Sequence, residues 1–251
     1  MPAPCMAIED IPVVLTHEIS AQLNSVATAT LTHQLHMHGL RSTFLTGLKP
    51  THPELRLLGR ARTLRYVALR EDVKDLLING RTAQKHVVET VQPGDVVVME
   101  ARGIPDAGTI GDIFTTRVQA LGGVGVITDG ALRDSPAIIE IGLPMYSQST
   151  HGSTYARHHM PYSVDDAITC AGVFVRPGDI VVGDGEGAVV IPHAMVADIA
   201  AAAVAQEEVE EFALERVRLG ETSDGVFPLT KERRPEFEAW KAGRTGTHFL
   251  T

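Results

Sequence analysis

A glycine-rich segment near the middle of the chain constrains the fold more than any other feature. Residues 122–134 read GGVGVITDGALRD. The apolar, β-branched run after three glycines predicts a buried strand from Val124 to Thr128 that ends at Asp129-Gly130. Arg133 and Asp134 follow side by side in a predicted loop. The segment is therefore expected to be a core strand that delivers a charged pair to the surface.

The Arg133-Asp134 pair combines two kinds of ligand. Arginine can hold a carboxylate through two parallel hydrogen bonds. Aspartate offers the hard oxygen that Mg²⁺ or Mn²⁺ prefers. An ordinary surface ion pair is the simpler interpretation when the pair is taken alone, because exposed pairs are common and weak.

Length and composition limit the remaining possibilities. The chain has 251 residues, of which 44% are hydrophobic, enough for one large α/β domain or two small ones. Its longest apolar runs are strand-length and no signal peptide is recognisable, so we expect a cytoplasmic protein outside the membrane. Two cysteines, Cys5 and Cys170, suggest neither a disulfide framework nor a zinc site. A formal charge of −9 argues against direct nucleic-acid binding.

Hydrophobic periodicity and turn residues predict alternating helices and strands. The expected helices cover residues 16–26, 30–38, 79–91, 192–219 and 233–240. The expected strands cover residues 59–67, the stretch after Pro93-Gly94, the stretch after Pro177-Gly178, and residues 188–191. We expect residues 1–221 to form the main domain, and residues 222–251 to form an arm that packs on the body or on a neighbouring subunit.

One motif occurs twice. Gln92–Val98 and Arg176–Val182 each contain a Pro-Gly-Asp turn followed by β-branched residues. A common turn explains this similarity at least as well as a duplication does. Under either interpretation both segments are predicted core strands. The second one continues through a glycine-rich turn into Ala188–Ile191, as in a β-hairpin.

A second glycine-rich turn precedes the segment 122–134. Residues 107–114 read AGTIGDIF and lead into a helix predicted to stop at Gly122-Gly123. The start of a helix exposes free backbone N–H groups and the positive end of the helix dipole, which suit a carboxylate. Such turns are frequent. In a β-α-β crossover, however, this turn and the Arg133-Asp134 loop lie at one edge of the sheet.

These motifs resemble the RraA-like family. The family includes class II 4-hydroxy-4-methyl-2-oxoglutarate/4-carboxy-4-hydroxy-2-oxoadipate aldolases and protein regulators of RNase E activity. The similarity rests on Gly111–Phe114 and Gly122–Asp134, with further support from Thr28–Thr32 and the two Pro-Gly-Asp turns. It covers roughly residues 15 to 221. The resemblance implies a layered α/β sandwich with a C-terminal helical arm, assembled as a homotrimer or homohexamer with active sites between subunits.

The resemblance also implies site residues. The backbone amides of four residues would hold the carboxylate of a 2-oxo acid substrate: Gly111, Asp112, Ile113 and Phe114. Arg133 would contact the oxygens of the oxo acid, and Asp134 would bind Mg²⁺ or Mn²⁺. Asp112 would support water bound to the metal. A glutamate from a neighbouring subunit's C-terminal helix would join this water shell, with Glu208 as the best match and Glu207 and Glu211 as competitors.

The implied reaction is a metal-dependent retro-aldol cleavage of a 4-hydroxy-2-oxo acid that releases pyruvate, with oxaloacetate decarboxylation as a side activity. A divalent metal and an arginine would stabilise the negative charge that develops on the oxo acid. No lysine lies in either motif, so a Schiff base is not expected. Two alternatives remain: a hydratase or dehydratase of a sugar-derived 2-oxo acid, and a non-enzymatic regulator of an RNA-processing protein.

The histidines are expected to lie outside the site. His33, His36 and His38 occupy one predicted helix and could be mistaken for a metal cluster. We interpret them as surface histidines, and we expect the same of His158 and His159.

Overall fold

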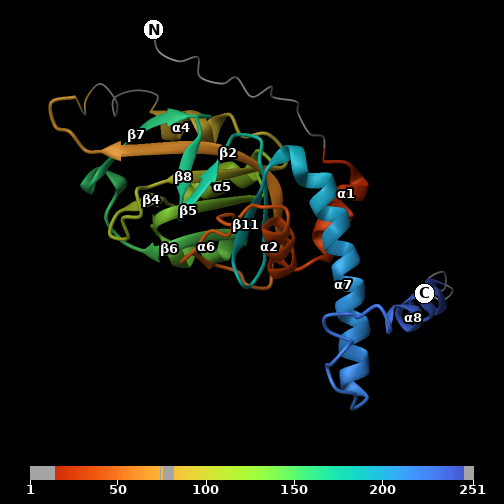
Figure 1. The fold of residues 1–251 in the computed structure, drawn as a ribbon. Helices are drawn as coiled ribbons and strands as arrows, with labels where there is room; N and C mark the ends of the chain where they lie inside the picture. The colour runs from red at the N-terminus through yellow and green to blue at the C-terminus, as the bar shows by residue number, and fades with distance from the viewer. Residues whose placement is uncertain (1–14, 74, 76–81, 246–251) are drawn as a thin grey trace, which may run out of the picture.

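The computed structural model describes residues 15–73, 75 and 82–245. A curled sheet with helices packed on it forms the body, and the long helix α7 leads away from the body towards α8 (Figure 1). This arrangement confirms the predicted α/β fold and the C-terminal helix. The helices are α1 (His17–Ser25), α2 (Thr28–Met37), α4 (Ala83–Glu89), α5 (Asp112–Ala120), α6 (Ser135–Ile141), α7 (Val196–Arg218) and α8 (Arg234–Thr245), with 3-10 turns η1 (Tyr155–Arg157) and η2 (His193–Met195).

Nine strands form the main sheet, in the order β1-β6-β5-β3-β2-β10-β11, with β4 paired to β5 and β7 paired to β2. The strands are β1 (Lys49–Pro50), β2 (Leu57–Ala68), β3 (Asp95–Glu100), β4 (Gly108–Ile110), β5 (Gly125–Leu132), β6 (Met145–Thr150), β7 (His159–Val164), β10 (Ile180–Gly183) and β11 (Ala188–Ile191). A separate hairpin pairs β8 (Ile168–Cys170) with β9 (Val173–Val175).

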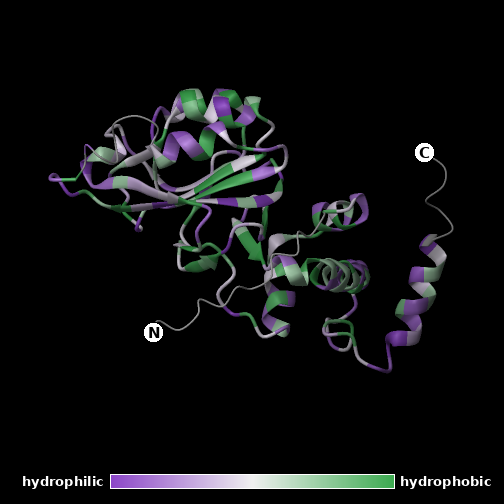
Figure 2. Cartoon of the chain, turned by 90° about the horizontal axis from the view of Figure 1, so that it is seen from above, coloured by the Kyte–Doolittle hydropathy of each residue, from purple (hydrophilic) through white to green (hydrophobic). Residues whose placement is uncertain are grey.

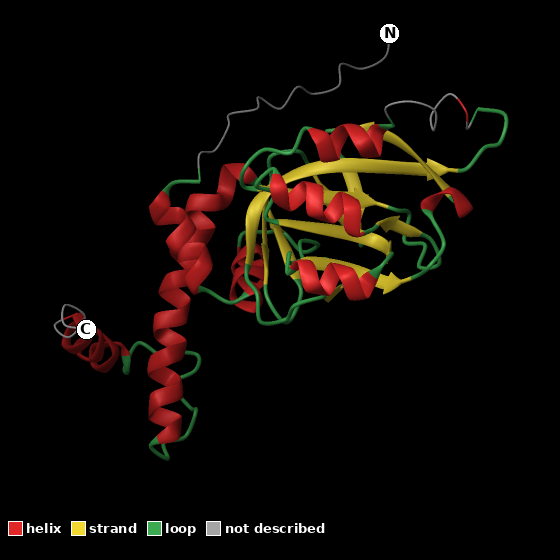
Figure 3. Cartoon of the chain, turned by 180° about the vertical axis from the view of Figure 1, so that it is seen from behind, coloured by secondary structure: helices red, strands yellow, loops and turns green. Residues whose placement is uncertain are grey.

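The middle of the sheet is parallel. Strand β3 runs parallel to both β2 and β5, and β5 runs parallel to β4 and β6. The carboxyl ends of these strands therefore lie at one edge of the sheet. Figures 1 and 3 show that α7 lies at the opposite end, beyond the start of β2. We call the first of these edges the carboxyl edge.

Strand β5 differs from the strand predicted within residues 122–134. Instead of ending at Asp129-Gly130, it continues to Leu132, and all its residues are buried. Its pairing with β6 shifts register between Thr128 and Ala131, so the two predicted turn residues form an irregularity inside the strand. Neighbouring strands hold this part from both sides, because β4 pairs with Ala131 and Leu132. A glycine is required at 130, where an added Cβ would lie 2.7 Å from Ala101 Cβ.

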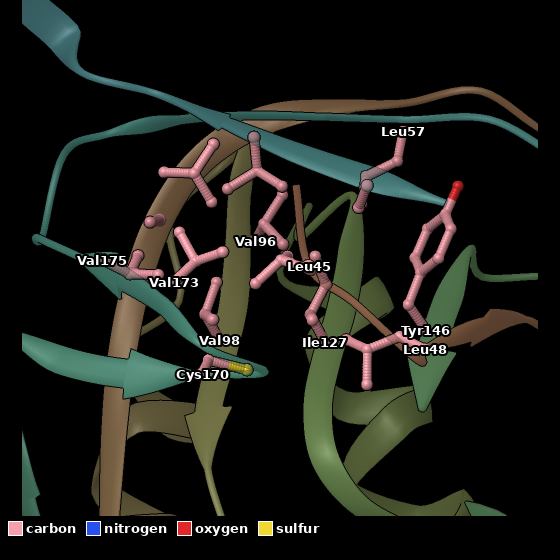
Figure 4. Close-up of a cluster of buried hydrophobic side chains, with 14 of the residues drawn as sticks. Leu45, Leu48, Leu57, Val96, Val98, Ile127, Tyr146, Cys170, Val173 and Val175 are labelled. Atoms are coloured by element: carbon pink, nitrogen blue, oxygen red, sulfur yellow. The ribbon is translucent and has the colours of Figure 1, made fainter. Parts of the chain in front are cut away.

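Helices cover one face of the sheet. Helices α4, α5 and α6 pack against β2, β3, β5 and β6 through a buried cluster that contains Val88, Val118 and Ile138 (Figure 3). The sheet curls over its other face, where the β8–β9 hairpin completes a second cluster. Figure 4 shows part of it, with Val96, Val98 and Ile127 facing Val173 and Val175. Helices α1, α2 and α7 pack on β10 and β11 in a third cluster.

Local signals explain where several elements begin and end. The Thr16 side chain caps α1 by accepting a hydrogen bond from Ile19 N, and Thr82 caps α4 in the same way. Helix α2 gives way at Gly39, whose φ of 91° favours glycine. The predicted helix over 79–91 is confirmed for Ala83–Glu89, and residues 79–81 lie outside the described residues.

The two Pro-Gly-Asp turns share one conformation. Asp95 accepts a hydrogen bond from Gln92 N, and Asp179 accepts one from Arg176 N, each at 2.8 Å. Both aspartates are buried, and the strands that follow them, β3 and β10, are core strands as predicted. The β10–β11 hairpin is also confirmed.

The C-terminal arm packs on α7 through a small separate core. Phe212 and Ala213 of α7 are buried against Phe237 of α8, with Trp240 stacked beside them. Ion pairs between the two helices, such as Arg216–Glu236, Lys241–Glu208 and Arg244–Glu211, flank this core. Figure 2 shows α8 standing apart from the hydrophobic strands of the body. Among the described residues, no helix is long and apolar enough to cross a membrane.

Candidate active site at the carboxyl edge of the sheet

Two successive strand-to-helix junctions meet at the carboxyl edge. Strand β4 leads into α5, whose N-cap is Gly111, and β5 leads through Arg133 into α6, whose N-cap is Asp134. The two strands are parallel neighbours, as the predicted crossover requires, and Arg133 N donates to Ile110 O at 2.9 Å. The structure therefore brings together two motifs that are about twenty residues apart in the sequence.

Two glycines of the first junction make room for the two charged residues of the second. A Cβ at position 108 would clash with the Cγ atom of Arg133, and a Cβ at position 111 would lie 2.6 Å from Asp134 Oδ2. Real Cβ atoms essentially never approach other atoms this closely. Gly108 and Gly111 thus allow the arginine stem and the aspartate carboxylate to lie directly against the backbone of β4 and the start of α5.

Asp134 has a constrained backbone and an available carboxylate. Its φ of 54° and ψ of 36° lie in the left-handed region, which costs free energy for residues other than glycine. Its side chain makes no capping hydrogen bond, is 42% exposed, and lies 3.8 Å from Arg133 Nη2. A strained residue whose carboxylate stabilises little around it is typical of a binding or catalytic position.

Arg133 contains an unused buried donor. Its Nε is inaccessible to solvent and has no hydrogen-bond partner among the described residues. Buried N–H groups are almost always paired, and an unpaired one costs about 1–3 kcal/mol. The rest of the guanidinium is reached by solvent, since the side chain is 36% exposed. A ligand carboxylate or oxo oxygen is the kind of group that pairs with such a donor.

The start of α5 places the other predicted substrate-binding residues at the same edge. Asp112 Oδ1 accepts a hydrogen bond from Ile113 N at 2.8 Å, so that amide already has a partner. The Ile113 side chain is 77% exposed, whereas Phe114 packs against the helix-covered core. Asp112 Oδ2 makes no hydrogen bond within the described chain and is available to a water molecule.

The C-terminal glutamates do not join the site within one chain. Glu208 lies on α7 and pairs with Lys241 Nζ at 2.5 Å, while Glu211 pairs with Arg244 at 2.6 Å. Glu207 accepts hydrogen bonds from Ala27 N and Thr30 Oγ1 beside α2. Helix α7 lies at the end of the sheet opposite the carboxyl edge (Figures 1 and 3), so these glutamates lie away from Asp134 of the same chain.

Comparison with known proteins identifies the family. The model of the RraA-like family (Aldolase/RraA) matches residues 28–190. This range includes both junctions and all the site residues of the body. The chain belongs to the RraA-like family. The match ends before α7, so it contains none of the three glutamates and none of the arm.

Three relatives of this RraA-like protein illustrate the range of the family. A Halalkalibacterium halodurans protein named "Putative 4-hydroxy-4-methyl-2-oxoglutarate aldolase" is 29% identical over 145 residues, which are 58% of this chain and 64% of that protein. The chain thus matches less than two thirds of this relative's length. The Streptomyces coelicolor structure of RraAS2, described as an unusual member of the RNase ES inhibitor RraA family, is 35% identical with a TM-score of 0.73 and covers 79% of this chain and 96% of RraAS2. An uncharacterised Pseudomonas syringae protein is 25% identical with a TM-score of 0.73 and covers 84% of this chain and 97% of its own.

The carboxylates of this RraA-like chain fit a hard divalent ion only in part. Asp112 and Asp134 lie at facing junctions and offer free carboxylate oxygens. Within the described residues, no three acidic, histidine or cysteine side chains gather closely enough to enclose a metal. Mg²⁺ keeps several water ligands and uses one or two carboxylates, so this oxygen-donor set is compatible with Mg²⁺ or Mn²⁺.

His159 does not lie on the surface, and the prediction is wrong for this residue. It is the first residue of β7 and is fully buried, because it pairs with Ala68 at the end of β2 and its ring lies 5.8 Å from that of Tyr66. Neither of its ring nitrogens has a hydrogen-bond partner among the described residues. Burial lowers its pKa to about 4. His158 is half-exposed and pairs with Asp106 at 3.0 Å. His33, His36 and His38 are exposed as predicted.

Sequence reasoning did not single out two residues that the structure places beside Arg133. Gly108 accommodates the arginine stem, and His151 follows β6 directly beside it. The glycine could have been noticed as part of a glycine-rich strand. No sequence pattern indicates His151, because its position depends on the register between β5 and β6.

Proposed function

We propose that this RraA-like protein is a divalent-metal-dependent carbon–carbon lyase. It cleaves a 4-hydroxy-2-oxo acid by a retro-aldol reaction that releases pyruvate, with oxaloacetate decarboxylation as a side activity. The observation that carries the proposal is the buried, unpartnered Nε of Arg133 next to the strained, available carboxylate of Asp134. The aldolase name of the Halalkalibacterium halodurans relative supports the same reaction class.

In this reaction the residues of the carboxyl edge bind and orient the substrate. Arg133 pairs with the oxygens of the oxo acid, and the amides at the start of α5 that remain free beside the Ile113–Asp112 hydrogen bond bind its carboxylate. The 4-hydroxyl group loses its proton, and its oxygen forms the C4=O bond of the departing carbonyl fragment as the C3–C4 bond breaks. The electron pair of the C3–C4 bond moves towards the 2-oxo oxygen, where the fixed charge of Arg133 stabilises it. Protonation of C3 then gives pyruvate.

A bound Mg²⁺ or Mn²⁺ would supply Lewis-acid chemistry to the same oxygens, with Asp134 as its ligand. Asp112 Oδ2 would accept a hydrogen bond from water in this region, which makes water the economical proton acceptor. We further propose that the protein assembles as a homotrimer or homohexamer, in which Glu208 of a neighbouring subunit reaches the site. The position of α7, away from its own carboxyl edge, supports this assembly.

A coupled pyruvate assay tests the proposal. The purified protein is incubated with a panel of 4-hydroxy-2-oxo acids and with oxaloacetate, with Mg²⁺ or Mn²⁺ and with EDTA. We expect pyruvate release that needs the metal. Release that survives complete chelation would contradict the metal-dependent mechanism, and no release from any substrate would remove the lyase proposal.

A regulatory role is the second candidate, and one observation favours it: the 35% identity to RraAS2, a member of an RNase ES inhibitor family. Inhibition of an RNase E-type enzyme by the purified protein would support it. Arg133→Gln separates the two functions, because loss of lyase activity with unchanged inhibition would place the regulatory surface elsewhere.

A further inference from the structure

His151 leaves the sheet directly beside Arg133. Leu132 pairs with Thr150 in the parallel β5–β6 ladder, so the next residues of the two strands, Arg133 and His151, are neighbours at the carboxyl edge. A hydrogen bond from His151 N to Leu132 O, at 2.9 Å, extends the ladder by one step. Paired residues of parallel strands project their side chains to the same face.

The loop after His151 also wraps the arginine. Ser153 O accepts a hydrogen bond from Gly108 N at 2.8 Å, and the same carbonyl lies 2.9 Å from the place where a Cβ of Gly108 would be. That place also adjoins the stem of Arg133. The loop residues 151–153 therefore lie next to the guanidinium-bearing side chain.

A backbone amide selects the tautomer of the His151 ring. Ser153 N donates a hydrogen bond to His151 Nδ1 at 3.0 Å. An N–H group can only donate, so Nδ1 must carry a lone pair, and the ring proton is on Nε2. Within the described chain Nε2 makes no hydrogen bond. Half-buried His151 thus holds, beside Arg133, an Nε2–H donor that has no partner among the described residues.

We propose that His151 is a substrate-binding residue of this site and donates its Nε2–H to an oxygen of the oxo acid held by Arg133. The inference rests on the lyase function proposed above and adds a neutral donor to the charged one. It assigns no proton transfer to His151, because a nitrogen that carries its proton in the neutral ring is a donor and not a base.

Two substitutions separate substrate binding from a structural role in the loop. In His151→Asn the side-chain oxygen can replace Nδ1 as acceptor for Ser153 N, but the donor at Nε2 is lost. In His151→Gln the longer amide can place an N–H near the position of Nε2, while the bond to Ser153 N is lost. His33→Asn, an exposed change on α2, serves as the matched control.

The measurements are KM for the best oxo acid and the affinity for oxalate, a small oxo-acid mimic, by calorimetry with Mg²⁺ present. We expect His151→Asn to raise KM and weaken oxalate binding roughly tenfold or more, the effect of one hydrogen bond to a charged ligand. His151→Gln should stay within about threefold of the wild type. Wild-type behaviour of His151→Asn, or a larger loss in His151→Gln than in His151→Asn, would overturn the inference.

The oxalate titration keeps this inference distinct from the lyase proposal. Wild-type protein that binds oxalate but turns over no substrate would remove the proposed reaction, and the effect of His151→Asn on oxalate affinity would still decide the role of His151. Wild-type protein that binds no oxalate would overturn the role of His151 as well.

Discussion

Arg62 and Arg133 belong to the same sheet and use the same side chain in different ways. Arg62, on β2, donates from Nε and Nη2 to the two carboxylate oxygens of Asp165, each at 2.8 Å, and from Nη1 to Thr90 O at 2.9 Å. It also lies 3.5 Å from the buried Asp95. Within the part of the chain that the structure describes, Arg133 has one ion-pair partner, Asp134, at 3.8 Å, and its Nε has no hydrogen-bond partner.

The two arginines differ in how many of their hydrogen-bond donors are paired with other groups of the protein. All three nitrogens of Arg62 bind groups of the same chain, so this residue joins β2 to its neighbours and leaves no donor for a ligand. The Arg133 stem is held by close packing against Gly108, while its side chain stays 36% exposed and its buried Nε has no partner among the described residues. The proposed binding role of Arg133 therefore rests on the donors that it leaves unused together with its place at the carboxyl edge, and not on the presence of an Arg-Asp pair.

The largest expected effect is the loss of activity when Arg133, and not Arg62, is replaced. Arg133→Gln should lower kcat/KM about a thousandfold, which corresponds to about 4 kcal/mol of transition-state stabilisation. It should change the urea midpoint little, because the chain makes few bonds to this side chain. Steady-state pyruvate release and urea unfolding measure both quantities. A variant that keeps most of its activity would show that the unused donors of Arg133 face no substrate.

Arg62→Gln tests the other half of the comparison. It breaks the bidentate pair with Asp165 and leaves Asp95 with one arginine fewer, and should lower the free energy of unfolding by about 3 kcal/mol. At temperatures where the variant is folded, kcat/KM should stay near the wild-type value. A selective loss of activity without loss of stability would contradict the structural role.

A variant of His159 tests whether a buried nitrogen without a hydrogen-bond partner always marks a ligand site. Because its pKa falls to about 4 in the folded protein from 6.5 in the unfolded chain, the unfolded chain takes up the proton first as the pH falls. Stability should therefore decrease between pH 6.5 and pH 4, by about 2–3 kcal/mol from this residue. His159→Phe should flatten this part of the stability profile and leave pyruvate release at pH 8 unchanged. A profile that keeps its slope would exclude His159 as the source.

The smallest expected change in stability concerns the backbone of Asp134. Asp134→Gly removes the carboxylate and relieves the left-handed conformation, so activity should vanish while stability rises by about 1 kcal/mol. Asp134→Asn removes only the charge and should change stability less. Thermal unfolding of the two variants, measured beside their pyruvate release, gives the comparison. Lower stability in the glycine variant would mean that the carboxylate supports the fold.

Much of the fold followed from the sequence because the deciding patterns are local. Turn residues and β-branched runs predicted β3 and β10, and glycine positions predicted where α2 ends and where α5 gives way to β5. The meeting of Gly111 with Arg133-Asp134 also followed, since a β-α-β crossover has few possible geometries.

The rest depended on pairing between distant segments. The extension of β5 through Asp129-Gly130 requires β4 and β6 on its two sides, and no residue within the strand indicates it. The burial of His159 depends on β7 pairing with the end of β2. The position of His151 depends on a register shift inside the β5–β6 ladder. Such long-range pairings leave no periodic pattern in a single sequence.

The length and stiffness of helix α7 determine how far from the body its glutamates lie. Its 23 residues contain neither glycine nor proline, so it is a stiff rod of about 34 Å whose first part is fixed by α1, α2 and the strands β10 and β11. The ion pairs and aromatic rings that join α8 to its far part make this end rigid as well. Its glutamates therefore move together with the body. Helix geometry, and not the conformations of a flexible linker, sets how far from the body they lie.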